Sequence, residues 1–165
     1  MRKRRVKTMI GLALGLVVIC ASGANAEPLA KSGAGTSHTG FKAMGTATEM
    51  SDKRSYWSGV SWGVSFNDEG KGFLHNMAWN CPHVDETVEG KTTAKGWCTL
   101  TDADGDTIFS EWTGSRPPGG ELSGHLGMTG GTGKYAGIQG EWDFRCKFII
   151  PGQAYCQQKY TYKLP

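Results

Sequence analysis

The segment IQGEWDFRCKFI, residues 138–149, decides the fold class of this chain. Large apolar side chains and polar or charged ones alternate along it, with Gly140 as the interruption. The apolar positions are Ile138, Trp142, Phe144, Cys146 and Phe148, and the polar positions between them are Gln139, Glu141, Asp143, Arg145 and Lys147. Alternation with a period of two is typical of a β-strand that has one buried face and one solvent-facing face.

Seven further segments show shorter stretches of the same alternation. They lie at residues 40–50, 57–66, 72–81, 95–101, 106–113, 121–128 and 154–163. The turn sequences NDEG (67–70), DG (104–105) and PG (151–152) favour hairpins between neighbouring segments. No segment has the length and pattern of a long helix. Because an even number of hairpin-connected strands can close without exposed edges, we predict an all-β fold, a small antiparallel eight-stranded β-barrel.

The first 26 residues have the composition of a secretory signal peptide. Five basic residues precede an uncharged, largely apolar stretch (9–21), and small residues stand at Ala24 and Ala26, where signal peptidase reads the chain. We expect cleavage after Ala26 and export to the periplasm or the extracellular medium. A lipid anchor at Cys20 is the less well supported alternative, because Ile19 stands where a lipobox has a small residue.

After cleavage the chain would consist of a flexible segment, residues 27–38, and a barrel domain, residues 39–165. Removing the five basic residues of the signal from the 18 Lys and Arg leaves 13, against 15 Asp and Glu, a net charge of −2. The net charge of +3 therefore belongs to the precursor. This balance predicts neither a nucleic-acid partner nor membrane association after cleavage, and an oligomer remains compatible with it.

Four cysteines remain in the mature chain, and an even number in an exported protein indicates two disulfides. The turn at 151–152 would place Cys146 opposite Cys156. The other bridge, Cys81–Cys98, would close a loop over residues 82–95. A zinc site is the rival interpretation, but the chain has no C-x-x-C pair. We predict no metal and no cofactor.

The most distinctive string is GGTGKYAGIQG, residues 130–140. It lacks residues that a phosphate-binding loop needs, and it lacks the strand-to-helix context of a dinucleotide-binding fingerprint. Its local meaning is a tight glycine-permitted crossover between two strands.

This string resembles the G-G-x-G-x-F/Y-x-G-x-x-G stretch of the allene oxide cyclase and dirigent superfamily of calycin-like barrels. The matching residues are Gly130, Gly131, Gly133, Tyr135, Gly137 and Gly140. The resemblance implies the eight-stranded barrel fold. It implies no single function, because some members are cyclases, others guide radical coupling, and many bacterial exported members have no assigned activity. No other cyclase motif is present, so no catalytic residue is transferred, and two disulfides are not expected from the plant cyclases.

Two short motifs suggest chemistry but lack its structural context. The string DADGD (102–106) is similar to a calcium loop, but its glycine is at the fourth position instead of the sixth, and Thr113 replaces the glutamate expected at the twelfth. The string GVSWG (59–63) spells G-x-S-x-G around Ser61, yet it lies inside an alternating strand instead of a strand-to-helix turn. We therefore expect neither a calcium site nor a serine nucleophile.

His75 and Glu111 are the ionisable residues expected to point inward. In the predicted hairpin around residues 104–105, Glu111 pairs with Cys98, and Trp97 pairs with Trp112 on the opposite face. A buried His–Glu pair can serve acid–base catalysis. A structural hydrogen-bonded pair, or exposure of both residues at the rim, is the alternative. The other histidines, His38, His83 and His125, are scattered and predict no metal cluster.

The six tryptophans raise the question of what the barrel holds. An eight-stranded barrel is either filled by its own side chains or leaves room for one small ligand. The favoured function is non-catalytic binding of a small hydrophobic ligand or a partner. A cyclase or isomerase that uses His75 and Glu111, and a structural or assembly protein with an exposed aromatic face, are the alternatives. The candidate ligand-binding residues are Trp62, His75, Met77, Trp79, Glu111 and Trp142.

Overall fold

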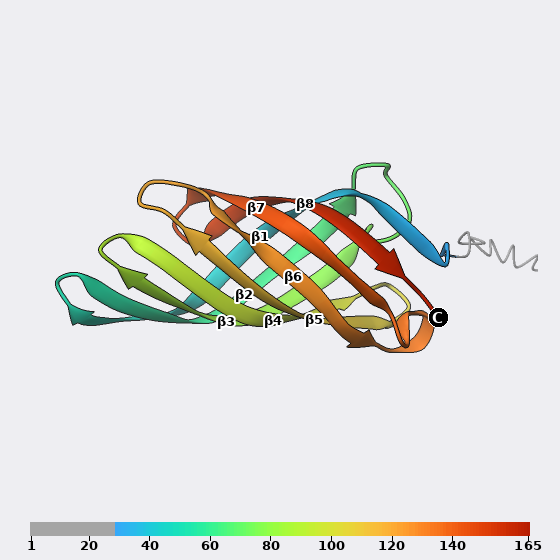
Figure 1. The fold of residues 1–165 in the computed structure, drawn as a ribbon, viewed down its shortest axis with the longest axis horizontal. Helices are drawn as coiled ribbons and strands as arrows, with labels where there is room; N and C mark the ends of the chain where they lie inside the picture. Colours follow the sequence, from blue (N-terminus) through green and yellow to red (C-terminus); the bar gives the residue numbers. More distant parts are fainter. Residues whose placement is uncertain (1–28) are drawn as a thin grey trace, which may run out of the picture.

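The computed structural model describes residues 29–165, which form one closed antiparallel barrel (Figure 1). Its strands follow one another around the barrel in chain order, and the last pairs with the first. The elements are β1 (Ser32–Ser51), β2 (Arg54–Asn67), β3 (Met77–Val88), β4 (Lys91–Thr101), β5 (Thr107–Arg116), β6 (Leu122–Gly131), the single 3-10 turn η1 (Gly133–Tyr135), β7 (Gln139–Ile150) and β8 (Gln153–Lys163). The predicted fold class is confirmed. The predicted signal peptide lies outside the described residues.

The first strand begins earlier than the sequence predicted. Residues 32–38, which we expected to be flexible, pair with the end of β8 and close the barrel. Two glycines in this stretch allow the closure, because a Cβ at Gly33 would lie 2.8 Å from the Tyr162 ring and one at Gly35 would lie 2.6 Å from the Tyr160 hydroxyl. This segment therefore consists of small residues because tyrosine side chains pack over it.

The third strand is displaced along the chain from its predicted position. It begins at Met77 and continues to Val88, and a two-residue turn at Glu89 and Gly90 leads directly into β4. The loop expected over residues 82–95 is therefore mostly strand. The inward positions in this part of β3 are polar, so the alternation that marks the other strands is absent here.

The register between β4 and β5 differs from the prediction by one residue. Glu111 pairs with Trp97, and Trp112 pairs with Gly96. Because side chains alternate between faces, this shift turns Glu111 to the outer face and Trp112 to the inner face. The predicted pairing of Glu111 with Cys98 is wrong.

Both predicted disulfides are confirmed. Cys81 is bonded to Cys98 and Cys146 to Cys156, with Cα–Cα distances of 4.1 and 4.0 Å. Each bridge joins residues that lie opposite one another on neighbouring strands and that point into the barrel. Such short Cα separations are typical of opposed positions that lack direct backbone hydrogen bonds.

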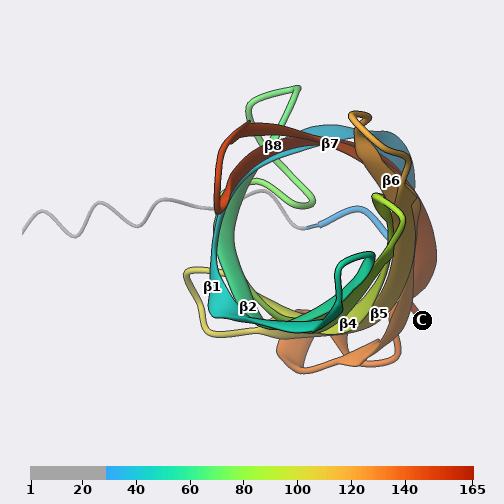
Figure 2. The same cartoon turned by 90° about the vertical axis from the view of Figure 1, so that its left-hand side faces the viewer.

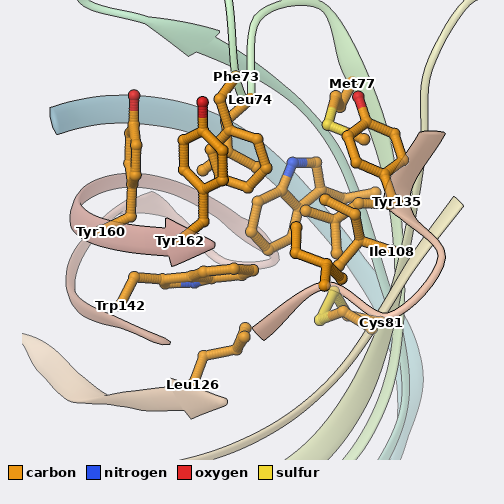
Figure 3. Close-up of a cluster of buried hydrophobic side chains, with 14 of the residues drawn as sticks. Phe73, Leu74, Met77, Cys81, Ile108, Leu126, Tyr135, Trp142, Tyr160 and Tyr162 are labelled. Atoms are coloured by element: carbon orange, nitrogen blue, oxygen red, sulfur yellow. A yellow bond between two sulfur atoms is a disulfide. The ribbon is translucent and has the colours of Figure 1, made fainter. Parts of the chain in front are cut away.

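One end of the barrel is filled by a hydrophobic core (Figure 3). The loop between β2 and β3 carries Phe73 and Leu74 into this end, where Phe73 stacks on Tyr162 at a ring-centroid distance of 4.0 Å. The Ser65 hydroxyl donates to the Leu74 carbonyl (2.7 Å), and the Asn67 amide donates to the Phe73 carbonyl (2.7 Å). These hydrogen bonds hold the loop against β2, so this end of the barrel is closed.

Among residues 29–165, no helix has the length and apolar character that crossing a membrane requires.

Candidate functional site

The other half of the barrel encloses a cavity of about 380 Å³. Its lining extends from the core toward the end formed by the four turns β1–β2, β3–β4, β5–β6 and β7–β8, the end that faces the viewer in Figure 2. Both disulfides are part of the wall. The interior is thus divided into a packed half and a half with room for a small molecule.

Aromatic side chains form much of the cavity wall. The Trp79 ring meets the edges of Phe41 and Trp142, each at a centroid distance of 5.6 Å. Trp112 and Phe144 form a further edge-to-face pair at 5.7 Å. Edge-to-face pairs at these distances hold the rings in fixed relative positions. The wall therefore presents a preformed apolar surface.

A hydrogen-bonded series of three polar side chains interrupts this wall on β2 and β3. The Ser61 hydroxyl lies 2.9 Å from His83 Nε2, and His83 Nδ1 lies 2.8 Å from Asp85 Oδ1. All three residues line the cavity. His83 and Asp85 share a face because they are two positions apart on β3, and Ser61 is a diagonal neighbour because Gly59 pairs with His83.

The hydrogen bonds determine how the imidazole is protonated when His83 is neutral. The Asp85 carboxylate only accepts, so Nδ1 carries the proton and Nε2 accepts from the Ser61 hydroxyl. The His83 side chain is 9% exposed and that of Asp85 is 27% exposed. A mostly buried histidine thus has both ring nitrogens engaged.

Two tryptophan rings and two glycines fix the position of this histidine. The centroids of Trp57 and Trp112 lie 4.5 and 5.4 Å from that of His83. A Cβ at Gly59 would lie 2.5 Å from the Trp57 ring, and one at Gly96 would lie 2.6 Å from His83 Cβ and 2.8 Å from Trp112 Nε1. The glycines on β2 and β4 therefore leave the space in which both indoles pack against the imidazole.

The indole N–H groups of Trp79 and Trp112 have no hydrogen-bond partner in the described part of the chain. Both side chains line the cavity, and Trp79 is only 3% exposed. An indole N–H can only donate, and leaving a buried donor unpaired is costly. Both nitrogens are covered by neighbouring atoms, so an acceptor oxygen of a molecule in the cavity would remove that cost once the ring moves to meet it.

The mouth of the cavity carries a cation. Arg116 lies in the wall, donates to the Thr92 hydroxyl (3.3 Å), and has its guanidinium carbon 4.9 Å from the centre of the Phe148 ring. Deeper in the wall, Gln158 is satisfied by Thr39 (2.8 Å) and Ser37 (3.1 Å). The glutamine is therefore a structural group, whereas the arginine is placed to meet an anionic group at the entrance.

The structure places the sequence-predicted site residues in three different environments. Trp79 and Trp142 line the cavity, and Met77 is buried in the adjoining core. Trp62 is on the outer face of β2 and is 43% exposed, and Glu111 is exposed on the outer face of β5. His75 lies in the loop between β2 and β3, with its ring near Phe66 at 6.1 Å. Neither His75 nor Glu111 lines the cavity, so the predicted acid–base pair does not reach it.

The sequence pattern does not predict the polar residues of the wall. It marks Ser61 only as the centre of a G-x-S-x-G string and His83 only as an isolated histidine. The available signal was the H-x-D spacing of His83 and Asp85, which puts both side chains on one face if residues 82–88 are strand.

The DADGD string (residues 102–106) and the glycine-rich string (residues 130–140) meet at the closed end of the barrel. The Lys134 ammonium lies 2.7 Å from Asp102 Oδ2 and 2.6 Å from Asp104 Oδ2, so a lysine occupies the position between the carboxylates of the calcium-like string. Burial of Asp102 would raise its pKa, but hydrogen bonds from Lys134, Tyr135 and the Asp104 backbone outweigh this and lower it. The same two aspartates raise the pKa of Lys134.

No family model matches the chain, and no curated protein sequence matches it. A solved structure, that of the pterocarpan synthase dirigent protein GePTS1, is similar to it with a TM-score of 0.50 at 9% sequence identity. The similarity covers 81% of this chain and 87% of that one. The fold is therefore a dirigent-like eight-stranded barrel. At this identity the likeness concerns the fold alone.

Proposed function

We propose that this protein is an exported barrel that binds one small aromatic molecule in the cavity at its open end. The observation that carries the proposal is the aromatic wall with two unpartnered indole donors, Trp79 and Trp112. Ligand pockets typically have about 300–1,000 Å³, walls of apolar and aromatic side chains, and a few polar groups that orient the ligand. The cavity of about 380 Å³ has these properties at the lower end of the size range.

The unpartnered donors support a ligand that carries an acceptor oxygen. A pure hydrocarbon would leave both indole N–H groups unpaired, whereas a carbonyl, phenol or ether oxygen would accept from at least one of them. The proposed ligand class is therefore a one- or two-ring aromatic compound with a carbonyl or ether oxygen.

The N-terminal sequence and the cysteines support export. The signal-like composition of residues 1–26 supports a mature protein that begins at Glu27 and lies in the periplasm or outside the cell. The two disulfides are compatible with this location, because thiols of cytosolic proteins are kept reduced. The intact mass of protein purified after export tests both points. We expect a chain that starts at Glu27 and gains four hydrogens on reduction, and a mass that retains residues 1–26 would overturn the proposed export.

Ligand binding is tested with two probes of matched shape. Benzophenone has two aromatic rings and a carbonyl oxygen, and diphenylmethane has the same rings without the oxygen. We expect benzophenone to quench the tryptophan fluorescence saturably and to bind at least about 5-fold more tightly than diphenylmethane, because one hydrogen bond to a buried donor is worth about 1 kcal/mol or more.

The matched variants are Trp112→Phe and Trp97→Phe. Trp112→Phe keeps a ring in the wall but removes one donor, and it should reduce the preference for benzophenone. Trp97 lies on the outer face, 55% exposed, so Trp97→Phe should leave the preference unchanged. If neither benzophenone nor diphenylmethane binds saturably, the proposed function is wrong.

A further inference from the structure

We propose that Ser61, His83 and Asp85 form a nucleophilic triad that cleaves small aryl esters held in the cavity. The inference rests on the proposed function only in that the cavity must admit a small aromatic molecule. A serine nucleophile needs a base within hydrogen-bond reach and a third group that orients the base. The distances of 2.9 Å from Ser61 Oγ to His83 Nε2 and of 2.8 Å from His83 Nδ1 to Asp85 Oδ1 meet both requirements.

The position of Ser61 on a regular strand does not prevent it from reacting. In hydrolases with a G-x-S-x-G elbow, a sharp turn is needed to expose the serine at the top of a sheet. Here the inner face of β2 is itself the wall of the cavity, so the hydroxyl faces the substrate space without a turn. Gly59 and Gly63, the neighbours of Ser61 on that face, add no side chains that would cover it.

The imidazole is held in one orientation before any substrate arrives. Trp57 and Trp112 pack near its ring, and Asp85 engages the nitrogen that does not face Ser61. All three triad residues lie on paired strands, which hold a site more accurately than loops do.

The donors for the developing oxyanion are the indole N–H groups. The backbone N–H groups of the strands belong to the sheet, so they are not free to bind an oxyanion. Trp79 is a diagonal neighbour of Ser61, because Gly63 pairs with Trp79 and Ser61 with Cys81, and Trp112 packs near His83. Both side chains line the cavity and both indole N–H groups are unpartnered, but their nitrogens are covered by neighbouring atoms, so the rings must move before these groups reach the oxyanion. Donors that meet charge as it develops are a major source of catalysis.

The reaction consumes one water for each ester. Ser61 Oγ attacks the carbonyl carbon while its proton moves to His83 Nε2, and the tetrahedral oxyanion accepts from the indole donors. The C–O bond to the leaving group then breaks, His83 returns the proton to the departing phenolate, and an acyl ester remains on Ser61. Water attacks this ester, gives a proton to His83, and releases the carboxylic acid as Ser61 regains its hydrogen.

The side chains that line the cavity indicate the class of substrate. Aromatic side chains such as Phe41, Trp79 and Phe144 suit an aryl leaving group, and Arg116 at the mouth suits the carboxylate product. A carboxylate group on the substrate would be disfavoured near Asp85, because like charges repel.

The test uses the exported, mature protein, purified with its disulfides intact. The probes are diisopropyl fluorophosphate, which phosphorylates activated serines, and 4-nitrophenyl benzoate, whose phenolate release is followed by absorbance. We expect one phosphoryl adduct per chain, mapped to the peptide that contains Ser61, and turnover of the ester. Heat-denatured protein should not be labelled, because the activation depends on the folded triad.

The variants separate reactivity from folding. Ser61→Ala should abolish labelling, and His83→Gln and Asp85→Asn should lower its rate by about 10³-fold, as expected when a member of a triad is removed. The matched control is Ser58→Ala, because Ser58 is on the same strand but is exposed on the outer face, away from the cavity. Its labelling rate should stay within about twofold of the unmodified protein.

The outcomes distinguish this inference from the proposed function. Benzophenone binding without labelling of Ser61, or labelling at another residue, would overturn the triad and leave the binding function standing. Labelling of Ser61 without benzophenone binding would support the triad and count against the proposed ligand class. If neither occurs, both proposals are wrong.

Discussion

The centre of the His83 imidazole lies 4.5 Å from that of the Trp57 indole, with the two ring planes inclined by 32°. The two residues come from neighbouring strands, and Gly59, which pairs with His83, leaves the room for the indole. A tryptophan that fills space between strands thus also positions the ring that accepts from Ser61. The packing of Trp57 and the hydrogen bond between Ser61 and His83 therefore depend on each other.

Removing the indole should loosen the imidazole. For Trp57→Ala we expect the rate of Ser61 phosphorylation by diisopropyl fluorophosphate to fall by about 10- to 100-fold, because small misplacements of a reacting group cost factors of this size. Tyr56→Ala is the control, since Tyr56 is the adjacent residue and is exposed on the outer face. Equal rates for the two variants would show that the stacking does not position His83.

Filling the cavity should block the ligand without unfolding the barrel. Ala43 lines the cavity on β1, so Ala43→Trp should weaken benzophenone binding by at least 10-fold. Ala78→Trp introduces the same side chain on the exposed outer face of β3 and should leave binding unchanged. Fluorescence titration and thermal unfolding of both variants check this. Unchanged binding by Ala43→Trp would place the ligand elsewhere.

Truncation of the closed end should affect stability more than binding. Leu74 is fully buried in the core, and deleting a buried leucine side chain typically costs about 2–5 kcal/mol. Leu74→Ala should therefore lower the free energy of unfolding in urea by about this amount, whereas Val84→Ala on the outer face should cost less than about 1 kcal/mol. At temperatures where the variant is folded, benzophenone binding should persist, and its loss would contradict the division of the interior into two halves.

The ion pairs of Asp102 predict how stability depends on pH. The pKa of Asp102 is lowered in the folded state from an ordinary value of 3.8, so its contribution is present above that value and is lost as pH falls through the folded pKa. Asp102→Asn should lower the urea midpoint at pH 7, and the difference from the unmodified protein should shrink under strongly acidic conditions. Asp52→Asn, in the exposed β1–β2 turn, is the control. A constant difference across this range would show that the charge of Asp102 is not the stabilising feature.

The alternating segments and the cysteine spacing predict the barrel and its disulfides. Hydrophobic alternation reports one buried face, and this is enough to count most strands and to pair cysteines across them. The register is harder to predict, because a shift of one residue exchanges the faces of a strand. A two-residue turn at 104–105 predicts Glu111 inside and Trp112 outside, but the connection has five residues, 102–106, and the register is shifted by one.

The polar part of the candidate site could not be derived from hydrophobic alternation. His83 and Asp85 point inward from a strand whose inner positions are polar, so this stretch looks like a loop. Ser61 and His83 are 22 residues apart, and bringing them together requires the β2–β3 register, which the long loop between the strands conceals. Polar side chains that line a cavity interrupt the apolar–polar alternation that predicts the strands, because they face inward without joining the hydrophobic core.

The measurement that tests the central claim most directly is photo-cross-linking with benzophenone, followed by peptide mapping. Irradiated benzophenone inserts into C–H bonds next to which it is bound, so the modified residue reports where the ligand lies. We expect saturable cross-links to residues of the cavity wall, such as Leu126 and Trp142, that diminish in Ala43→Trp. Cross-links confined to outer-face residues such as Trp62 and Trp97 would contradict a ligand-binding cavity in this barrel.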